Sequence, residues 1–309
     1  MIALFDGHCD TFFHLTAKGS NLAENDLHLD LTRAARYAPY AQFFSIWGTP
    51  EACKRNNVFE LSLQCINREL SKNKHTIRLC KTAADAKSAF SGGQAAAFFS
   101  IEGAHVIDCD QTLLNKAQAF GIRSFGLTWN NANVLCGSHC EDAQRGLSEQ
   151  GREFVRKLNE LCVIIDVSHL SDKGFWDVCA LSISPIIASH SNSRYIHAHS
   201  RNLTDDQFCA IIEKNGVAGI NLYADMIGGS ADITQLLRHI LHFLDLNGEK
   251  HISLGTDFDG CSNLCRGING MQDLPRLYDA MLAEKIPEPV VQDVFINNLM
   301  RVVEDICVM

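Results

Sequence analysis

The sequence Ile2-Ala3-Leu4-Phe5-Asp6-Gly7-His8-Cys9-Asp10 begins with an apolar run and ends in polar side chains. The run predicts a buried strand over residues 2–6. Side chains two positions apart share one face of an extended strand, so we expect His8 and Asp10 to converge just past its end. An imidazole beside a carboxylate is a common pair of metal ligands, although a single His-x-Asp also occurs by chance in solvated turns. The pattern indicates a metal site only if other strands also end in histidine or carboxylate side chains.

Further apolar runs follow, and helical patterns separate most of them. The predicted strands cover residues 2–6, 41–46, 95–101, 122–127, 163–167, 185–189, 217–222 and 252–255. The predicted helices cover residues 53–71, 111–120, 150–161, 172–180, 205–215 and 233–246, and an amphipathic closing helix is expected over residues 288–307. Strands that alternate with helices favour a parallel sheet, and eight strands in 309 residues favour one (β/α)₈ TIM barrel.

The organisation of the chain is simple. We find no linker, low-complexity tract or repeat, so we expect a single catalytic domain over residues 1–309. Two segments, residues 11–39 and 130–147, are predicted loop insertions that fold over the mouth of the barrel.

Composition excludes several classes of partner. The formal net charge is −9 and Lys and Arg do not cluster, so the sequence offers no basic surface for a nucleic acid. No apolar run is long enough to span a membrane, and the first residues lack a signal-peptide pattern. We therefore expect no membrane association and a cytoplasmic location.

The 13 cysteines are expected to be mostly free thiols in a reducing compartment. The segment Cys136-Gly137-Ser138-His139-Cys140 contains a Cys-x-x-His-Cys pattern, but a fourth zinc ligand is missing nearby and the segment is rich in loop-forming residues. Cys261 and Cys265 flank a similar short loop. We therefore predict no structural zinc at either place.

Ligand-type side chains follow five of the predicted strands. They are His8 and Asp10 after the first strand, Glu102 after the third, His169 after the fifth, His190 after the sixth and Asp257 after the eighth. The carboxyl ends of all strands in such a barrel meet at one rim, which is where its active sites lie. We therefore predict that these side chains share one cavity and bind metal.

The ligand types constrain the metal. Imidazoles and carboxylates without a thiolate suit Zn²⁺, Mn²⁺ or Fe²⁺, and this set exceeds the needs of one tetrahedral zinc. We expect two ions, with His8 and Asp10 on one, His169 and His190 on the other, and Glu102 bridging them. The ions would generate a hydroxide that attacks a carbonyl, and Asp257 would pass a proton to the leaving amine.

Several stretches, taken together and in order, resemble the membrane dipeptidase (renal dipeptidase) family of zinc dipeptidases. They are Asp6-Gly7-His8-Cys9-Asp10, Ile101-Glu102-Gly103-Ala104-His105, Leu127-Thr128-Trp129-Asn130, Ile165-Asp166-Val167-Ser168-His169-Leu170-Ser171, Ser189-His190-Ser191, Ser200-Arg201-Asn202-Leu203, Gly255-Thr256-Asp257-Phe258-Asp259-Gly260 and Asn298-Leu299-Met300-Arg301-Val302. The resemblance implies a (β/α)₈ barrel, two Zn²⁺ per chain and a homodimer. It also implies hydrolysis of dipeptides that have a free C-terminal carboxylate, including those with a D-residue at that end.

The resemblance also assigns roles to individual residues. It implies that the zinc ligands are His8, Asp10, Glu102, His169 and His190, with Glu102 as the bridge. Asp257 matches the catalytic acid/base, Arg201 the residue that binds the substrate carboxylate, and Tyr223 a further substrate-binding residue. Trp129 stands where the animal members place a histidine that stabilises the tetrahedral intermediate. The metals, Asn130 or His105 would then have to supply that stabilisation.

Two alternatives to the dipeptidase remain at this level. One is a related barrel metallohydrolase acting on another amide, a lactam, a cyclic imide or a phosphoester, for which a bridging lysine or the absence of Arg201 would be the mark. Lysine is absent from the strand ends. The other is a non-catalytic metal-binding barrel, against which the presence of Asp257 argues.

Overall fold

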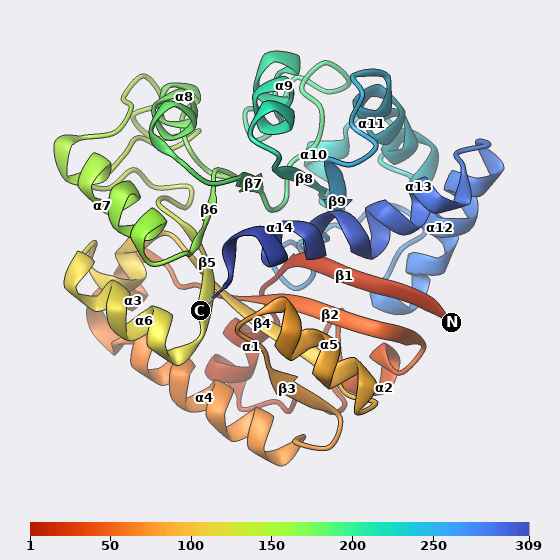
Figure 1. Cartoon of the computed structure of the whole chain (residues 1–309), viewed down its shortest axis with the longest axis horizontal. Helices are drawn as coiled ribbons and strands as arrows, with labels where there is room; N and C mark the ends of the chain where they lie inside the picture. Colours follow the sequence, from red (N-terminus) through yellow and green to blue (C-terminus); the bar gives the residue numbers. More distant parts are fainter. Residues whose placement is uncertain (309) are drawn as a thin grey trace.

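The computed structural model describes residues 1–308, and its centre is a closed barrel of parallel strands (Figure 1). The barrel strands are β1 (Ile2–Cys9), β2 (Tyr37–Ile46), β4 (Ala95–Glu102), β5 (Ile122–Gly126), β6 (Ile164–Asp166), β7 (Ile186–Ala188), β8 (Val217–Ile220) and β9 (Ile252–Leu254). Each pairs in parallel with the next, β2 pairs directly with β4, and β9 returns to β1. The predicted (β/α)₈ barrel is confirmed, and every predicted strand is one of its members.

A ninth strand, β3 (Ile77–Leu79), escaped prediction because Arg78 separates its two apolar residues, so that no apolar run marks it. One edge of β4 pairs with β2 through residues 96–101. The other edge pairs with β3 through residues 95–97 and then with β5 through residues 99–102. Since β3 and β5 share that edge, β3 extends the wall of the barrel without adding a member to the ring.

Helices cover the outside of the barrel in the expected alternation. They are α1 (Thr11–Lys18), α2 (Leu31–Ala34), α3 (Pro50–Asn56), α4 (Val58–Lys72), α5 (Ala83–Ser91), α6 (Leu114–Phe120), α7 (Glu149–Glu160), α8 (Asp172–Leu181), α9 (Asp205–Glu213), α10 (Ala224–Ile227), α11 (Ile233–Asp245) and α12 (Leu274–Ala283). The single helix predicted over residues 53–71 was wrong, because Asn57 adopts a left-handed φ of 43° and caps the start of α4 through Glu60 N–H. Five of these helices, α1, α2, α5, α10 and α12, lie where no helix was predicted.

Aromatic side chains fill the amino-terminal half of the barrel interior. Phe5, Phe43 and Phe98 come from three adjacent strands, and their ring centroids lie 5.3 to 5.6 Å apart. The chain ends in α13 (Glu288–Gln292), a π-helical segment (Asp293–Asn297) and α14 (Asn298–Ile306), and Leu299 of α14 packs into the same cluster. The predicted closing helix is confirmed, and it runs across the barrel in Figure 1. The carboxyl rim is left for the functional site.

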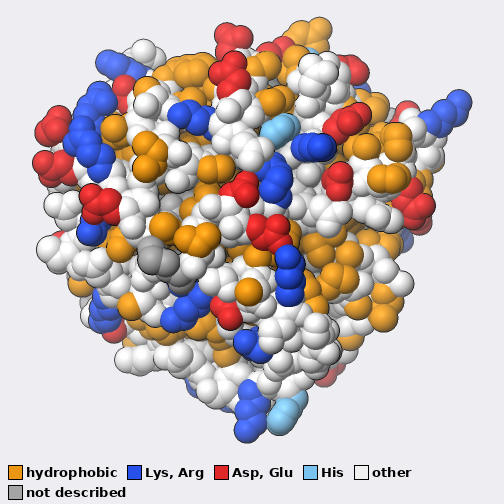
Figure 2. All heavy atoms as spheres, viewed as in Figure 1, with side chains coloured by type: hydrophobic (Ala, Val, Ile, Leu, Met, Phe, Trp, Pro, Cys, Tyr) orange, Lys and Arg blue, Asp and Glu red, His pale blue; other side chains and the backbone are white. Residues whose placement is uncertain are grey.

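The surface offers little to a membrane or a polyanion on the face seen in Figure 2. Acidic and basic side chains are interspersed there, without a large area of one sign. Within residues 1–308, no helix combines the length and the apolar character that a bilayer crossing requires. All 13 cysteines are free thiols, as predicted.

Candidate active site

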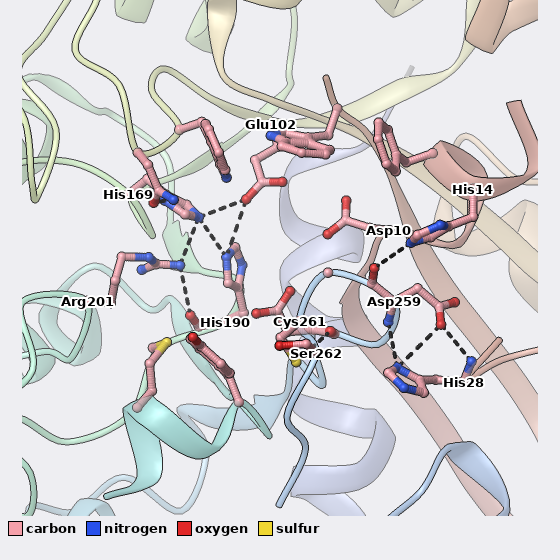
Figure 3. A pocket seen from close by; sticks show the side chains of 18 of the residues that line it. Asp10, His14, His28, Glu102, His169, His190, Arg201, Asp259, Cys261 and Ser262 are labelled. Atoms are coloured by element: carbon pink, nitrogen blue, oxygen red, sulfur yellow. Dashed lines mark hydrogen bonds and ion pairs between the residues drawn. The ribbon is translucent and has the colours of Figure 1, made fainter. Parts of the chain in front are cut away.

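A cavity of about 710 Å³ opens at the carboxyl rim of the barrel (Figure 3). The predicted site residues that line it are Asp10, Glu102, Trp129, His169, His190, Arg201, Tyr223 and Asp257. His8 lies beneath them and is 1% exposed. The segments over residues 11–39 and 130–147 add His14, His28 and His139 to the walls. The structure therefore brings all the predicted residues to one place, although they span most of the chain.

An irregularity in β1 aims His8 into this cavity. Phe5 faces the barrel interior, so strict alternation would turn His8 outward and Cys9 inward. The pairing of β1 with β2 shifts register between Asp6 and Cys9, and Cys9 instead packs in the outer core. Because a bulge re-aims the side chains that follow it, His8 and Asp10 both reach the mouth of the barrel. Their Nε2 and Oδ2 atoms lie 3.5 Å apart.

Glu102 stands in the middle of the histidines. Its Oε2 lies 3.6 Å from His8 Nε2, and its Oε1 lies 2.8 Å from His169 Nε2 and 3.5 Å from His190 Nε2. Figure 3 shows His169 and His190 converging on this carboxylate from one side. One carboxylate that faces histidines with both oxygens has the geometry of a bridge between two ions.

Hydrogen bonds set the tautomers of the two histidines. The Ser189 hydroxyl donates to Asp166 Oδ2 at 2.5 Å, so it accepts the hydrogen of His190 Nδ1 at 2.7 Å. His169 Nδ1 donates to Asn130 Oδ1 at 3.1 Å. Both Nε2 atoms are therefore left with lone pairs, yet they lie 3.0 Å from each other. Two facing lone pairs fit a cation bound between or beside them.

Two further buried atoms point to the same conclusion. His8 Nε2 and Asp10 Oδ1 have no hydrogen-bond partner within residues 1–308. The ligand atoms of His8, Glu102 and His190 lie within 4.8 Å of one another, as do those of His8, Asp10 and Asp257. Buried polar atoms without partners are costly, and a divalent cation would satisfy them. The residues present therefore fit the metal centre that the sequence predicts.

Burial dominates the electrostatics of this cluster. It raises the pKa of Glu102 well above its ordinary value, and it lowers the pKa values of His169 and His190, with the charge of Arg201 adding to the effect. Burial also lowers the pKa of His8, but Glu102 and Asp10 outweigh it and raise that pKa to about 10. Neutral imidazoles at His169 and His190 are the form that binds metal.

Asp257 lies beside His8 and Asp10, and within residues 1–308 no lysine, arginine or histidine forms an ion pair with its carboxylate. Its backbone has a left-handed φ of 59°, and its Oδ2 accepts a hydrogen bond from Asn221 Nδ2 at 3.1 Å. Burial raises its pKa to about 6, against the opposing charge of His8. A carboxylate with a pKa close to neutral can both accept and return a proton.

Gly260 allows the loop after β9 to approach this carboxylate. A Cβ at this position would lie 2.3 Å from Asp10 Oδ2 and 2.3 Å from Asp257 Oδ1. Gly260→Ala should displace both carboxylates and weaken zinc binding by about 10- to 100-fold, the range found for groups that hold metal ligands in place. Zinc titration of the apoprotein measures this. Gly126→Ala is the matched control, since its Cβ would meet no atom closer than 3.7 Å, and equal zinc affinity in the two variants would contradict the assignment.

Arg201 is a buried cation on the opposite side of the cavity. It is 6% exposed, and it donates to Ser168 O, to His169 Nε2 at 3.0 Å and to His190 O at 3.4 Å. Within residues 1–308, no carboxylate lies within ion-pair distance of its guanidinium. Burial lowers its pKa to about 10. A buried guanidinium without a counter-ion is suited to bind an anionic ligand.

The remaining predicted residues form the rim. Tyr223 lines the cavity, and its hydroxyl donates to Asp225 Oδ2 at 2.6 Å. Trp129 packs against Trp47 with ring centroids 4.9 Å apart, so the residue that departs from the animal family members forms an aromatic wall. His105 was one suggested substitute for the missing histidine, but its Nε2 pairs with Gly48 O at 2.7 Å and it does not line the cavity. That suggestion was wrong.

Three residues near the ligands were not predicted. Asp166 and Ser189 orient His190, while His139 lies beside His169 and pairs with Asn130, the other suggested substitute for the missing histidine. Asp166 and Ser189 belong to quoted motifs, and their position on the barrel face could have signalled them. His139 had no such signal, because it lies in a loop.

Comparisons with known proteins agree with this geometry. A family model described as membrane dipeptidase (peptidase family M19) matches residues 1–308. A metallopeptidase of Rhodobacter sphaeroides, solved with a phosphinate mimic of the dipeptide L-Ala-D-Ala, is 29% identical, with a TM-score of 0.88 and 99% of both chains covered. The solved structure of a metallopeptidase named dipeptidase AC is 30% identical, with a TM-score of 0.90, and covers 99% of this chain and 98% of its own.

A curated relative points the same way. Dipeptidase TcpJ of Claviceps purpurea is 26% identical over 296 residues, which are 90% of this chain and 69% of the relative. The family match over nearly the whole chain is the decisive finding. The chain therefore belongs to the membrane dipeptidase family, and it is a metallopeptidase that cleaves dipeptides.

Proposed function

We propose that the protein hydrolyses dipeptides with a free C-terminal carboxylate, including L-D dipeptides, at a centre of two Zn²⁺ ions. The observation that carries this proposal is the buried guanidinium of Arg201, which pairs with no carboxylate of residues 1–308 and lies 3.0 Å from a predicted metal ligand. A dipeptide carries a carboxylate one residue beyond the scissile bond. Arg201 can bind that carboxylate while the peptide carbonyl lies over the ligand cluster.

The ligands divide into two groups around Glu102. His8 and Asp10 would hold the first ion and His169 and His190 the second, with Glu102 shared. When bound, the ions acidify a water molecule and polarise the peptide carbonyl.

The remaining steps belong to side chains. Asp257 accepts the proton of the attacking water and transfers it to the departing amine, because its carboxylate lies beside the first ligand group and its pKa is near 6. Arg201 holds the substrate carboxylate by charge-assisted hydrogen bonds and so orients the scissile bond. Tyr223 and Trp129 contact the substrate from the rim.

The comparisons support the substrate class. The Rhodobacter sphaeroides relative was solved with a mimic of L-Ala-D-Ala, which is a dipeptide with a free carboxylate and a D-residue at that end. That relative and this chain cover 99% of each other with a TM-score of 0.88, so the two proteins share one fold. Support for L-D substrates comes from this likeness alone.

Finer properties are also proposals. Zinc is the proposed metal because histidine and carboxylate ligands suit it, with Mn²⁺ or Fe²⁺ as the alternatives. The cytoplasm is the proposed compartment, supported by the 13 free cysteines. We also propose that the chain forms a homodimer and that residues 1–309 make up a single domain.

The test compares a free dipeptide with its C-terminal amide in the wild type and in Arg201→Met. Amidation removes the charge that Arg201 binds, so wild-type kcat/KM should fall by about 10- to 150-fold, the equivalent of a charged hydrogen bond worth about 1.5–3 kcal/mol. Arg201→Met should reduce hydrolysis of the free dipeptide by a similar factor and barely change that of the amide.

The comparison is a double-mutant cycle between enzyme and substrate. Arg276→Met, on α12, is the matched control and should leave both substrates unaffected. Additive losses from amidation and from Arg201→Met would show that the two groups do not meet. That result would favour the related hydrolase that acts on other amides or lactams.

A further inference from the structure

His139 lies at the centre of a hydrogen-bond bridge between the metal cluster and the loop that carries Arg201. Its Nε2 donates to Asn130 Oδ1 at 2.8 Å, and its Nδ1 pairs with the Ser200 hydroxyl at 2.9 Å. Its backbone N–H donates to His169 O at 3.0 Å. Ser200 is the residue before Arg201. The loop over residues 130–147 is thereby tied to both proposed functional groups.

Asn130 Oδ1 receives two imidazole hydrogens. One comes from His139 Nε2, and the other comes from His169 Nδ1 at 3.1 Å. An asparagine amide can turn over and present its NH₂ group instead of its oxygen. If the Asn130 amide turned over while the two imidazoles kept these tautomers, its NH₂ hydrogens would face the N–H groups of His139 and His169. His139 therefore holds the amide in the orientation that accepts from His169.

The orientation of Asn130 sets the tautomer of His169 together with Arg201, which donates to His169 Nε2 at 3.0 Å. With the oxygen facing His169, the imidazole carries its hydrogen on Nδ1, and Nε2 keeps the lone pair that faces Glu102 Oε1 at 2.8 Å. With the NH₂ group facing it, Nδ1 would have to accept and Nε2 would carry the hydrogen. Nε2 could then not bind a metal ion.

We propose that His139 is a positioning residue which, through Asn130, holds His169 in the tautomer that binds the second metal ion. This inference rests on the proposed two-metal function. Both ring nitrogens of His139 are paired within the protein, one with Asn130 and one with Ser200. Its place in the Cys136–Cys140 segment is therefore explained without a structural zinc.

The test measures zinc affinity of the apoprotein by competition with a coloured chelator, which needs no peptide hydrolysis. His139→Phe keeps a ring but removes both hydrogen-bonding atoms. It should weaken one of the two zinc sites by about 10- to 100-fold and leave the other unchanged. His139→Gln retains an amide N–H donor and should recover much of the affinity. His242→Phe, on α11 and stacked on Tyr195, is the matched control.

A second set of variants, made in the Asn130→Asp protein, distinguishes a positioning role of His139 from a role in folding the loop over residues 130–147. Asn130→Asp presents oxygen whichever way it turns, so His139 is no longer needed to orient it. The loss caused by His139→Phe should largely disappear in the Asn130→Asp protein. An equal loss in both backgrounds, or wild-type affinity in His139→Phe, would overturn the inference. A wild type that binds two ions but cleaves no dipeptide would overturn only the proposed function.

Discussion

Asp257→Asn is expected to keep both metal ions while turnover of a dipeptide falls by about 10²–10⁴-fold, the usual cost of losing a general acid/base. The amide has the size of the carboxylate and can still pair with Asn221, which bonds Asp257 at 3.1 Å. It cannot take a proton from the attacking water or deliver one to the leaving amine. The effect should therefore appear in kcat more than in KM.

Two measurements accompany the turnover assay of this variant. Elemental analysis should give the wild-type zinc content, and the thermal midpoint should be close to that of the wild type. Asp279→Asn, on the exposed side of α12, makes the same chemical change away from the cavity and should be fully active. Near-native turnover in Asp257→Asn would exclude the proton-transfer role.

His190→Ala is expected to lose one of the two ions and to reduce turnover by about 10³-fold or more. A bound ion supplies several kcal/mol of transition-state stabilisation, and each 1.36 kcal/mol corresponds to a factor of ten in rate. His190 is 2% exposed and is oriented by Ser189 and Asp166, so no solvent-exposed group can easily replace its Nε2. His169→Ala should behave in the same way.

The control for these variants is His251→Ala. This histidine precedes β9, at the opposite end of the barrel, and pairs with Gly216 O at 2.9 Å. Its removal should cost about 1 kcal/mol of stability and no zinc. Full zinc content in both His169→Ala and His190→Ala would contradict the assignment of the second ion.

Much of the fold follows from features that act locally. The runs that end in Glu102, His169 and His190 are long and apolar, and parallel pairing brings every carboxyl end to the same rim. The five predicted ligands therefore meet in one cavity although no local rule links them. The strand β3 was missed because Arg78 interrupts its apolar residues and leaves no apolar run, and the break at Asn57 was missed because the apolar pattern continues across it.

Other features depend on contacts that sequence patterns do not encode. Alternation predicts that His8 and Asp10 share a face, but not the register shift in β1 that turns this face inward. The bridge of Asn130, His139, His169 and Ser200 joins positions up to 70 residues apart, and all four lie in loops. Only the folded chain shows which polar groups are paired and which are left for a ligand.

The measurement that tests the account most directly is a zinc titration of the apoprotein in which the hydrolysis of L-Ala-D-Ala is followed at each metal ratio. Two ions shared by Glu102 predict little activity at one equivalent and full activity at two zinc ions per chain. Full activity at one equivalent would contradict the two-ion centre. A chain that binds two ions but does not cleave this or any other free dipeptide would contradict the function itself.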